Sequence, residues 1–172
     1  MKLVRAALPV ALLVLGTAGA QAGDNPVNRT NAFIEQAALG GMFEIETSRV
    51  ALDKSSNPAV REFSQTMIDE HTEVDKELRA AVAAANVQSP PLPTVLDKAH
   101  SDMVIELKKE TAEDFDEAYV DDLVDAHEKA IVLFEDYAKD GDNPVLKKFA
   151  ADTLPVLKQH KEHVDKLDNK VD

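Results

Sequence analysis

The nonapeptide TMIDEHTEV, residues 66–74, lies in the middle of the amphipathic pattern that decides the fold. Apolar side chains recur around it three, four and seven residues apart, a spacing that places them on one face of a helix. They are Val60, Phe63, Met67, Val74 and Leu78. His71 follows Met67 by four residues, so we expect it on the same buried face. A histidine in such a stripe is either a hydrogen-bonded core residue or a ligand.

The same periodicity predicts an all-α protein. Helices are expected over residues 32–54, 58–85, 113–139 and 144–167, with a shorter one over residues 95–109. Asn57-Pro58 and Asn143-Pro144 each join an N-cap residue to a proline that fits the first helical turn. Thr30 or Asn31 is the expected N-cap of the first helix, and Thr94 that of the short one. The prolines of residues 88–93 break the chain between two antiparallel helical hairpins, and the short helix is part of their crossover. We therefore predict a four-helix bundle.

The N-terminus has the pattern of a cleavable signal peptide over residues 1–22. Lys2 and Arg5 precede an apolar run over residues 6–15, and the small residues that follow permit cleavage after Ala20 or Ala22. The run is shorter than the roughly 20 residues that a membrane span requires. We expect a periplasmic or secreted protein without a membrane span after cleavage. A polar leader at 23–30, the bundle at 31–168 and a tail at 169–172 would follow.

The composition restricts the possible partners. The net charge of the 172 residues is −13, and removal of Lys2 and Arg5 with the signal peptide gives −13 − 2 = −15. Such a chain repels nucleic acid and anionic membranes but attracts cations and basic envelope partners. The sequence has no cysteine, which excludes disulfides, iron–sulfur clusters, covalently attached haem and a lipoprotein anchor.

Polar residues near the middle of each long helix predict a metal site. Glu44 precedes Asn57 by 13 residues and His71 follows it by 14, while His127 precedes Asn143 by 16 and His160 follows it by 17. At about 1.5 Å per residue, the members of each hairpin pair lie at nearly equal height. If both turns lie at one end of the bundle, the two pairs differ by about 4.5 Å. We predict that Glu44, His71, His127 and His160 form one cluster.

Three imidazoles and a carboxylate suit tetrahedral zinc or a related divalent ion such as copper, nickel or cobalt. The alternative or orienting residues are Glu46, Glu70, Glu128, Glu135 and His163. A di-iron centre requires Glu-x-x-His pairs, which these histidines lack. Haem held by Met42 and His160 or His163 needs only two residues and is a weakly specific match. No catalytic triad, P-loop or nucleophile motif is visible, so we expect binding rather than turnover.

Several ordered segments resemble the family known as domain of unknown function 4142. They are residues 33–53 (FIEQAALGGMFEIETSRVALD), residues 63–72 (FSQTMIDEHT), residues 125–130 (DAHEKA) with 134–135 (FE), and residues 149–160 (FAADTLPVLKQH). The resemblance covers roughly residues 30–168. It implies an exported bacterial protein with a ferritin-like four-helix bundle, of a kind often labelled a predicted outer-membrane protein.

Two functions are compatible with these observations. The first is binding of a divalent metal ion in the bundle core, for sequestration, sensing or envelope stress tolerance. The second is a non-catalytic structural or interaction module of the cell envelope whose histidines are core residues. The two differ in whether the imidazole nitrogens are free to bind a metal, which depends on their positions in three dimensions.

Overall fold

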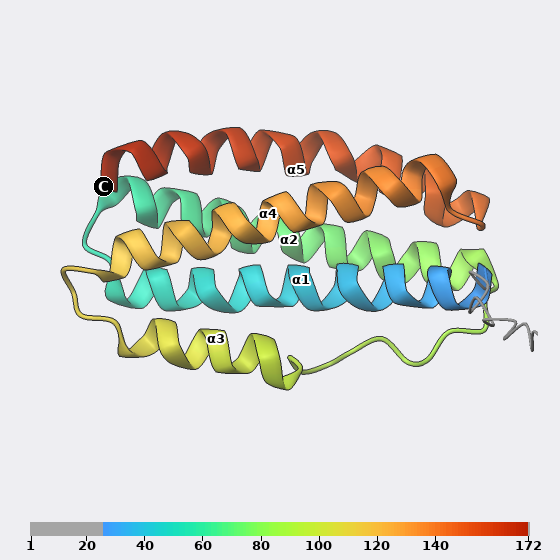
Figure 1. Ribbon diagram of the computed structural model, residues 1–172, viewed down its shortest axis with the longest axis horizontal. Coiled ribbons are helices and arrows are strands. Elements are labelled where there is room, and N and C mark those ends of the chain that lie inside the picture. The colour runs from blue at the N-terminus through green and yellow to red at the C-terminus, as the bar shows by residue number, and fades with distance from the viewer. Residues whose placement is uncertain (1–25, 172) are drawn as a thin grey trace, which may run out of the picture.

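The computed structural model describes residues 26–171, with side chains described for 27–168. This part of the chain forms five helices and no strand, and none of the helices is long and apolar enough to cross a membrane. The helices are α1 (Pro26–Lys54), α2 (Pro58–Ala85), α3 (Lys98–Lys109), α4 (Phe115–Asp140) and α5 (Pro144–Val171). The predicted four-helix bundle with an extra crossover helix is confirmed (Figure 1). The proposed signal peptide lies outside the described residues.

Some predicted helix ends are wrong by several residues. α1 starts at Pro26 instead of residue 32, and Thr30, expected as its cap, is buried within the helix with its hydroxyl 2.8 Å from that of Tyr137. α3 starts at Lys98 because Asp97, not Thr94, caps it by accepting from the backbone N–H of His100. α5 continues through Val171 into the predicted tail. Capping residues and tertiary contacts determine where these helices begin and end, and the apolar periodicity of the sequence does not reveal those contacts.

The two hairpin turns lie at opposite ends of the bundle, which corrects our expectation that they share one end (Figure 1). Asn143, in the α4–α5 turn, donates to the carbonyl of Ala85 at the end of α2, whereas Lys54 at the end of α1 contacts the segment before α4. The linker after α2 and helix α3 return the chain along the outside of α1 before α4 begins. One long crossover of this kind is typical of ferritin-like bundles.

The polar residues still meet, because the cluster is near the middle of every long helix. It lies 13–14 residues from the Asn57 turn and 16–17 from the Asn143 turn. At about 1.5 Å per residue, these distances add to roughly 45 Å, close to the length of the helices. Positions that are central on all four helices reach the same level from either end of the bundle.

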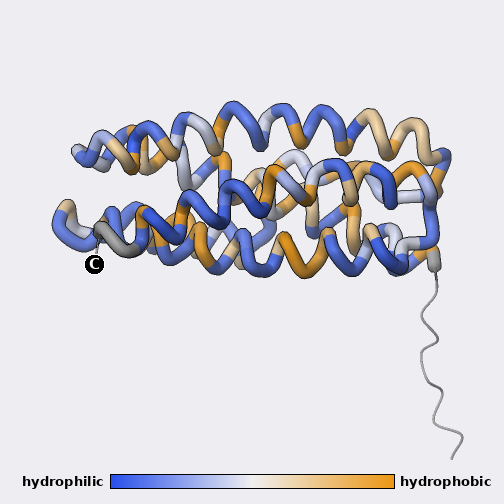
Figure 2. Tube along the Cα trace, turned by 90° about the horizontal axis from the view of Figure 1, so that it is seen from above, coloured by the Kyte–Doolittle hydropathy of each residue, from blue (hydrophilic) through white to orange (hydrophobic). Residues whose placement is uncertain are grey.

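Each helix buries an apolar stripe, and Figure 2 shows apolar and hydrophilic segments alternating along the trace. The inward stripe of α5 is buried along its length: Leu146, Phe149, Thr153, Leu157, His160, Val164 and Leu167. On α1, Ile34, Ala38 and Ser48 are buried, whereas Ile45 and Leu52 are half-buried. The buried residues of α1 include Phe33, Phe43, Glu44, Thr47 and Ala51. α1 packs against α3 as well as α2 and α4, so its buried face is broader than a single stripe.

A polar layer divides the apolar core in two. One half is built around Phe63, Tyr119 and Leu123, and the other around Phe33, Phe134 and Tyr137. Four buried polar residues lie between the halves: Glu44, His71, His127 and His160. On its own helix, each of them lies between an apolar residue of one half and an apolar residue of the other half. The fold therefore buries four polar side chains at one level of its core.

Tyr119 connects three helices through its hydroxyl. The phenol of α4 lies 2.9 Å from the hydroxyl of Ser48 on α1 and 3.0 Å from that of Ser64 on α2. Tyr119→Phe should lower the free energy of unfolding by about 1–2 kcal/mol, because buried hydroxyls lose a partner. Tyr137→Phe, which removes one such contact to Thr30, should cost about 1 kcal/mol. Urea denaturation measures both changes, and an unaltered midpoint in Tyr119→Phe would contradict the prediction.

Candidate metal centre

Three buried histidines from three helices face one another at mid-bundle. The ring centroids of His71 and His127 are 5.8 Å apart, those of His71 and His160 are 5.2 Å apart, and those of His127 and His160 are 5.4 Å apart. One nitrogen from each ring lies within 4.8 Å of the other two. The predicted clustering of these three histidines is confirmed. The sequence-predicted histidines therefore form one compact group.

Glu44 of α1 lies at the edge of this group. Its Oε2 is 3.1 Å from Nδ1 of His71, and its Oε1 is 3.3 Å from Nδ1 of His127. The side chain is 3% exposed, so its carboxyl group is removed from water. Glu44 thus meets the two imidazoles on their Nδ1 side, away from their Nε2 atoms.

The outward nitrogens of the other two rings also have acceptors. Nδ1 of His127 donates to the carbonyl of Leu123 one turn earlier, at 2.9 Å. Nε2 of His160 lies 2.6 Å from Oε2 of Glu70 on α2, a carboxylate that is 46% exposed. An acceptor on one nitrogen fixes the tautomer and leaves a lone pair on the other. Histidines that bind metals commonly have such a partner.

The remaining nitrogens are left without partners. Among the described residues, Nε2 of His71, Nε2 of His127 and Nδ1 of His160 are buried and form no hydrogen bond. Oε1 of Glu44 also lacks a hydrogen bond. A buried polar atom without a partner costs roughly 1–3 kcal/mol, and four at one level is a concentrated penalty. Such a group needs a physical explanation, and a ligand that these atoms share would supply one.

Burial shifts the ionisation of all four groups toward their neutral forms. It raises the pKa of Glu44 to about 8 and lowers the pKa of His127 to about 4. The pKa of His71 falls well below its usual range because of burial and the neighbouring His160 and His127. Burial also lowers the pKa of His160, although Glu70 opposes the shift. The cluster therefore holds neutral imidazoles, the form that ligates metals.

The protonation of Glu44 sets the tautomer of His71. A protonated carboxyl donates to Nδ1 of His71, whereas a carboxylate accepts from Nδ1–H and leaves the lone pair on Nε2. A cation among the rings favours the carboxylate, because an adjacent positive charge stabilises the ionised form. A cation bound among the rings would therefore release a proton from Glu44.

The other candidate residues lie away from the three rings. Glu46 pairs with Arg49, Glu128 with Lys161 and Glu135 with Lys158, all through partly exposed side chains. His163 is exposed on α5, with its ring 4.8 Å from that of Phe63. Of the suggested orienting residues, the structure brings Glu70 to the cluster.

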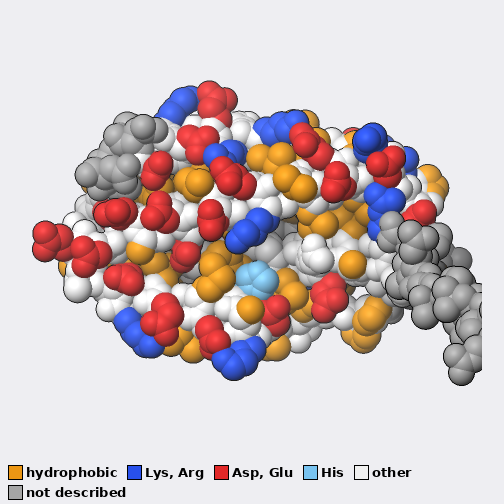
Figure 3. Space-filling view, viewed as in Figure 1, with side chains coloured by type: hydrophobic (Ala, Val, Ile, Leu, Met, Phe, Trp, Pro, Cys, Tyr) orange, Lys and Arg blue, Asp and Glu red, His pale blue; other side chains and the backbone are white. Residues whose placement is uncertain are grey.

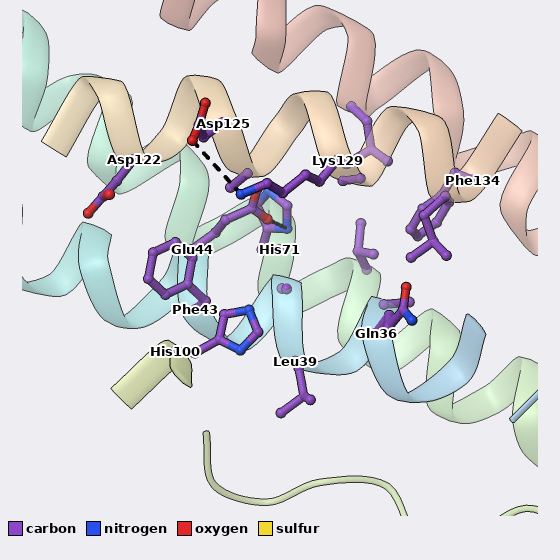
Figure 4. Close-up of a pocket in the computed structure, with 18 of the residues that line it drawn as sticks. Gln36, Leu39, Phe43, Glu44, His71, His100, Asp122, Asp125, Lys129 and Phe134 are labelled. Carbon is purple, nitrogen blue, oxygen red and sulfur yellow. Dashed lines mark ion pairs between the residues drawn. The ribbon is translucent and has the colours of Figure 1, made fainter. Parts of the chain in front are cut away.

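A pocket of about 310 Å³ opens beside the cluster, between α1 and α4, and was not anticipated from the sequence. Glu44 and His71 line it together with His100 and Lys129 (Figure 4), and Asp97 is also part of its lining. The side chain of His100 is 31% exposed, and its Nδ1 lies 2.8 Å from Oδ1 of Asp97. No sequence spacing indicated this group, because α3 meets α1 and α4 only through the tertiary fold.

The adjacent glycines of α1, Gly40 and Gly41, are not required by a close helix contact. A Cβ at Gly41 would lie 3.8 Å from Nδ1 of His71, which is an ordinary contact distance. A Cβ at Gly40 would meet no atom of the described residues within 4 Å. Each glycine costs about 1 kcal/mol of helix stability relative to alanine. At Gly40, no steric contact explains why a residue that weakens the helix is present.

Comparison with known proteins agrees with the fold. Residues 16–167 match the family described as "Domain of unknown function (DUF4142)". The chain belongs to the DUF4142 family. A solved structure similar to this DUF4142 protein is that of a DUF305 fragment from Deinococcus radiodurans, with a TM-score of 0.69 and 12% sequence identity. The similarity covers 83% of this chain and 96% of that one, and at this identity it concerns the fold alone. No curated protein matches the chain.

The raised pKa of Glu44 predicts how metal-free stability changes with pH. A folded-state pKa of about 8 against 4.5 for the unfolded chain means that the folded state holds the proton more tightly. The stability that the folded state gains from holding this proton is fully present below pH 4.5 and is lost as pH rises toward 8. In chelator, Glu44→Gln should therefore gain stability relative to wild type by up to about 1 kcal/mol per pH unit in that range. Glu46→Gln is the matched control, and an equal pH response in both variants would refute the prediction.

Proposed function

We propose that this protein binds one divalent transition-metal ion, such as zinc, at the centre of its bundle. His71, His127 and His160 would supply three nitrogen ligands. Glu44, which lies on the Nδ1 side of His71 and His127, would orient these rings and balance charge. The observation that carries the proposal is the set of three buried, unpartnered imidazole nitrogens on rings whose other nitrogens already have polar partners.

The ligand chemistry suits a borderline cation. Neutral imidazoles bind zinc, copper, nickel and cobalt, whereas magnesium and calcium prefer oxygen ligands. The charge also balances, because a dication is neutralised by the carboxylates of Glu44 and Glu70. Between them those carboxylates touch all three rings, as expected for partners that orient metal-binding histidines.

Metal binding would require a small contraction of the cluster. Nitrogens bound at about 2.0–2.1 Å in a tetrahedral site lie about 3.3 Å from one another. One nitrogen of each ring lies within 4.8 Å of a nitrogen of the other two, so the rings would move inward by about 1 Å.

The proposed setting is the cell envelope. The pattern of residues 1–22 supports export to the periplasm or the medium, and the acidic composition favours cations over nucleic acid as partners. In that setting we propose sequestration or sensing of a metal, or support of envelope stress tolerance. The proposed role is binding of a metal ion, without catalytic turnover of a substrate.

Metal stoichiometry tests the proposal directly. Chelator-stripped, untagged mature protein should bind one Zn²⁺ or Co²⁺ per chain, with a rise in melting temperature that grows with the metal concentration. His71→Ala, His127→Ala and His160→Ala should each lose stoichiometric binding. His163→Ala is the matched control, because it removes an exposed histidine from the same helix as His160. Retention of stoichiometric metal by the three cluster variants would end the proposal.

The stability of the metal-free protein separates this function from the structural alternative. His127 contributes one hydrogen bond, to a carbonyl one turn earlier, and buries an unpartnered nitrogen. His127→Leu should therefore keep or raise the free energy of unfolding in chelator, because an apolar side chain of similar size removes the penalty. If the histidine stabilises the core instead, the variant should lose about 1–3 kcal/mol in urea denaturation. Tyr119→Phe, which is predicted to lower the free energy of unfolding, provides a comparison in the same assay.

A further inference from the structure

The histidine cluster is closed to solvent, so an ion needs a route to reach it. The side chains of His71, His127 and His160 are 0–4% exposed. The pocket between α1 and α4 extends from the outer face of the bundle to Glu44 and His71 (Figure 4). Its volume of about 310 Å³ accommodates a hydrated ion with room to spare.

The inner end of the pocket offers a ligand to an arriving cation. Glu44 lines the pocket and is 3% exposed, and its Oε1 has no hydrogen-bond partner among the residues described. The same carboxyl group lies within 3.1–3.3 Å of His71 and His127. An ion that reaches Glu44 is therefore next to the cluster.

The outer part of the pocket carries a net negative charge. Asp97, Asp122 and Asp125 line it together with Lys129, so the formal charge of these four groups is −3 + 1 = −2. Lys129 lies 3.8 Å from Asp125, as the dashed line in Figure 4 marks. Burial is the main reason that the pKa of Asp122 is raised to about 6, and the neighbouring negative charges of Asp121 and Asp125 add to the shift. Negative charge is therefore crowded here.

The setting of these charges strengthens their effect on a cation. Acidic side chains are spread over the face that carries α1, α3 and α4, as Figure 3 shows. The pocket walls between the rim and Glu44 are largely apolar, with Leu39, Phe43 and Leu133 among them. Charges of one sign above low-dielectric walls focus the field into a cleft and raise the local concentration of the opposite ion.

Gly40 contributes no side chain to the wall of this pocket. It lines the pocket, and a Cβ added there would meet no described atom within 4 Å. Packing therefore does not require glycine, although glycine weakens the helix. A large side chain at this position would extend into the pocket.

We infer that the pocket lined by Gly40, Asp122 and Glu44 is the route by which divalent cations enter and leave the histidine cluster, with Glu44 as the last ligand before the imidazoles. This inference rests on the proposed metal-binding function. To that function it adds the direction from which the cation approaches the cluster, which is the α1–α4 face. The competing route runs between α2 and α5, where the partly exposed Glu70 touches His160.

Stopped-flow mixing of Co²⁺ with chelator-stripped mature protein measures the rate of entry, and the final absorbance measures the stoichiometry. Gly40→Leu should bind Co²⁺ on the order of tenfold more slowly than Gly40→Ala, with equal stoichiometry, because access then awaits a conformational opening. Gly40→Ala is the matched control, since it shares the gain in helix propensity but leaves the pocket open. Circular dichroism confirms that both variants fold.

A second pair of variants tests the rim without changing the packing. Asp122→Asn with Asp125→Asn should slow Co²⁺ entry about tenfold at low salt, and the difference should shrink at high salt. The control is Glu73→Gln with Glu162→Gln, which changes the net charge equally but on α2 and α5. If Gly40→Leu does not fold, this pair decides alone.

The outcomes are distinguishable. Equal rates in the two Gly40 variants at normal stoichiometry overturn the route, and so does equal or greater slowing by the α2–α5 control pair. Those results would leave the metal site intact and favour approach past Glu70. A wild-type protein that binds no stoichiometric Co²⁺ overturns both the route and the proposed function.

Discussion

The burial of one carboxyl group among three imidazoles is the constraint around which this bundle is arranged. Glu44, His71, His127 and His160 come from four different helices and occupy one level of the core. Their polar atoms cannot be left at random in an apolar interior, since each unpartnered group costs free energy. The helices must therefore keep a register in which Glu44 meets His71 while Glu70 meets His160.

Two apolar half-cores stabilise that register from above and below. Phe33, Phe134 and Tyr137 pack on one side of the polar layer, and Phe63, Tyr119 and Leu123 pack on the other. Each half also contains a buried tyrosine hydroxyl paired with a hydroxyl on another helix, which fixes helix position more specifically than apolar packing does. The stability of the fold is thus supplied by the halves, and the layer between them is free to serve a function at some energetic cost.

The surface complements this arrangement. The partners of the outward imidazole nitrogens include a carboxylate that reaches solvent, Glu70, and a carboxyl group at the end of a pocket, Glu44. A cation bound at the centre would be neutralised by both groups, and each marks a possible direction of approach. The acidic rim and the side-chain-free position of Gly40 favour the α1–α4 direction.

The sequence by itself determined the helices, the hairpins and the identity of the central residues. Periodicity is a local property, so it revealed that His71, His127 and His160 face inward, and counting from the turns placed them near mid-height. It could not orient the hairpins, and the turns proved to lie at opposite ends. Which nitrogen of each ring is free, the contact of Glu44 with Nδ1 of His71, and the pocket under α3 were decided only by the tertiary structure. These features depend on ångström-scale distances between side chains far apart in the chain, which residue spacing along a helix does not encode.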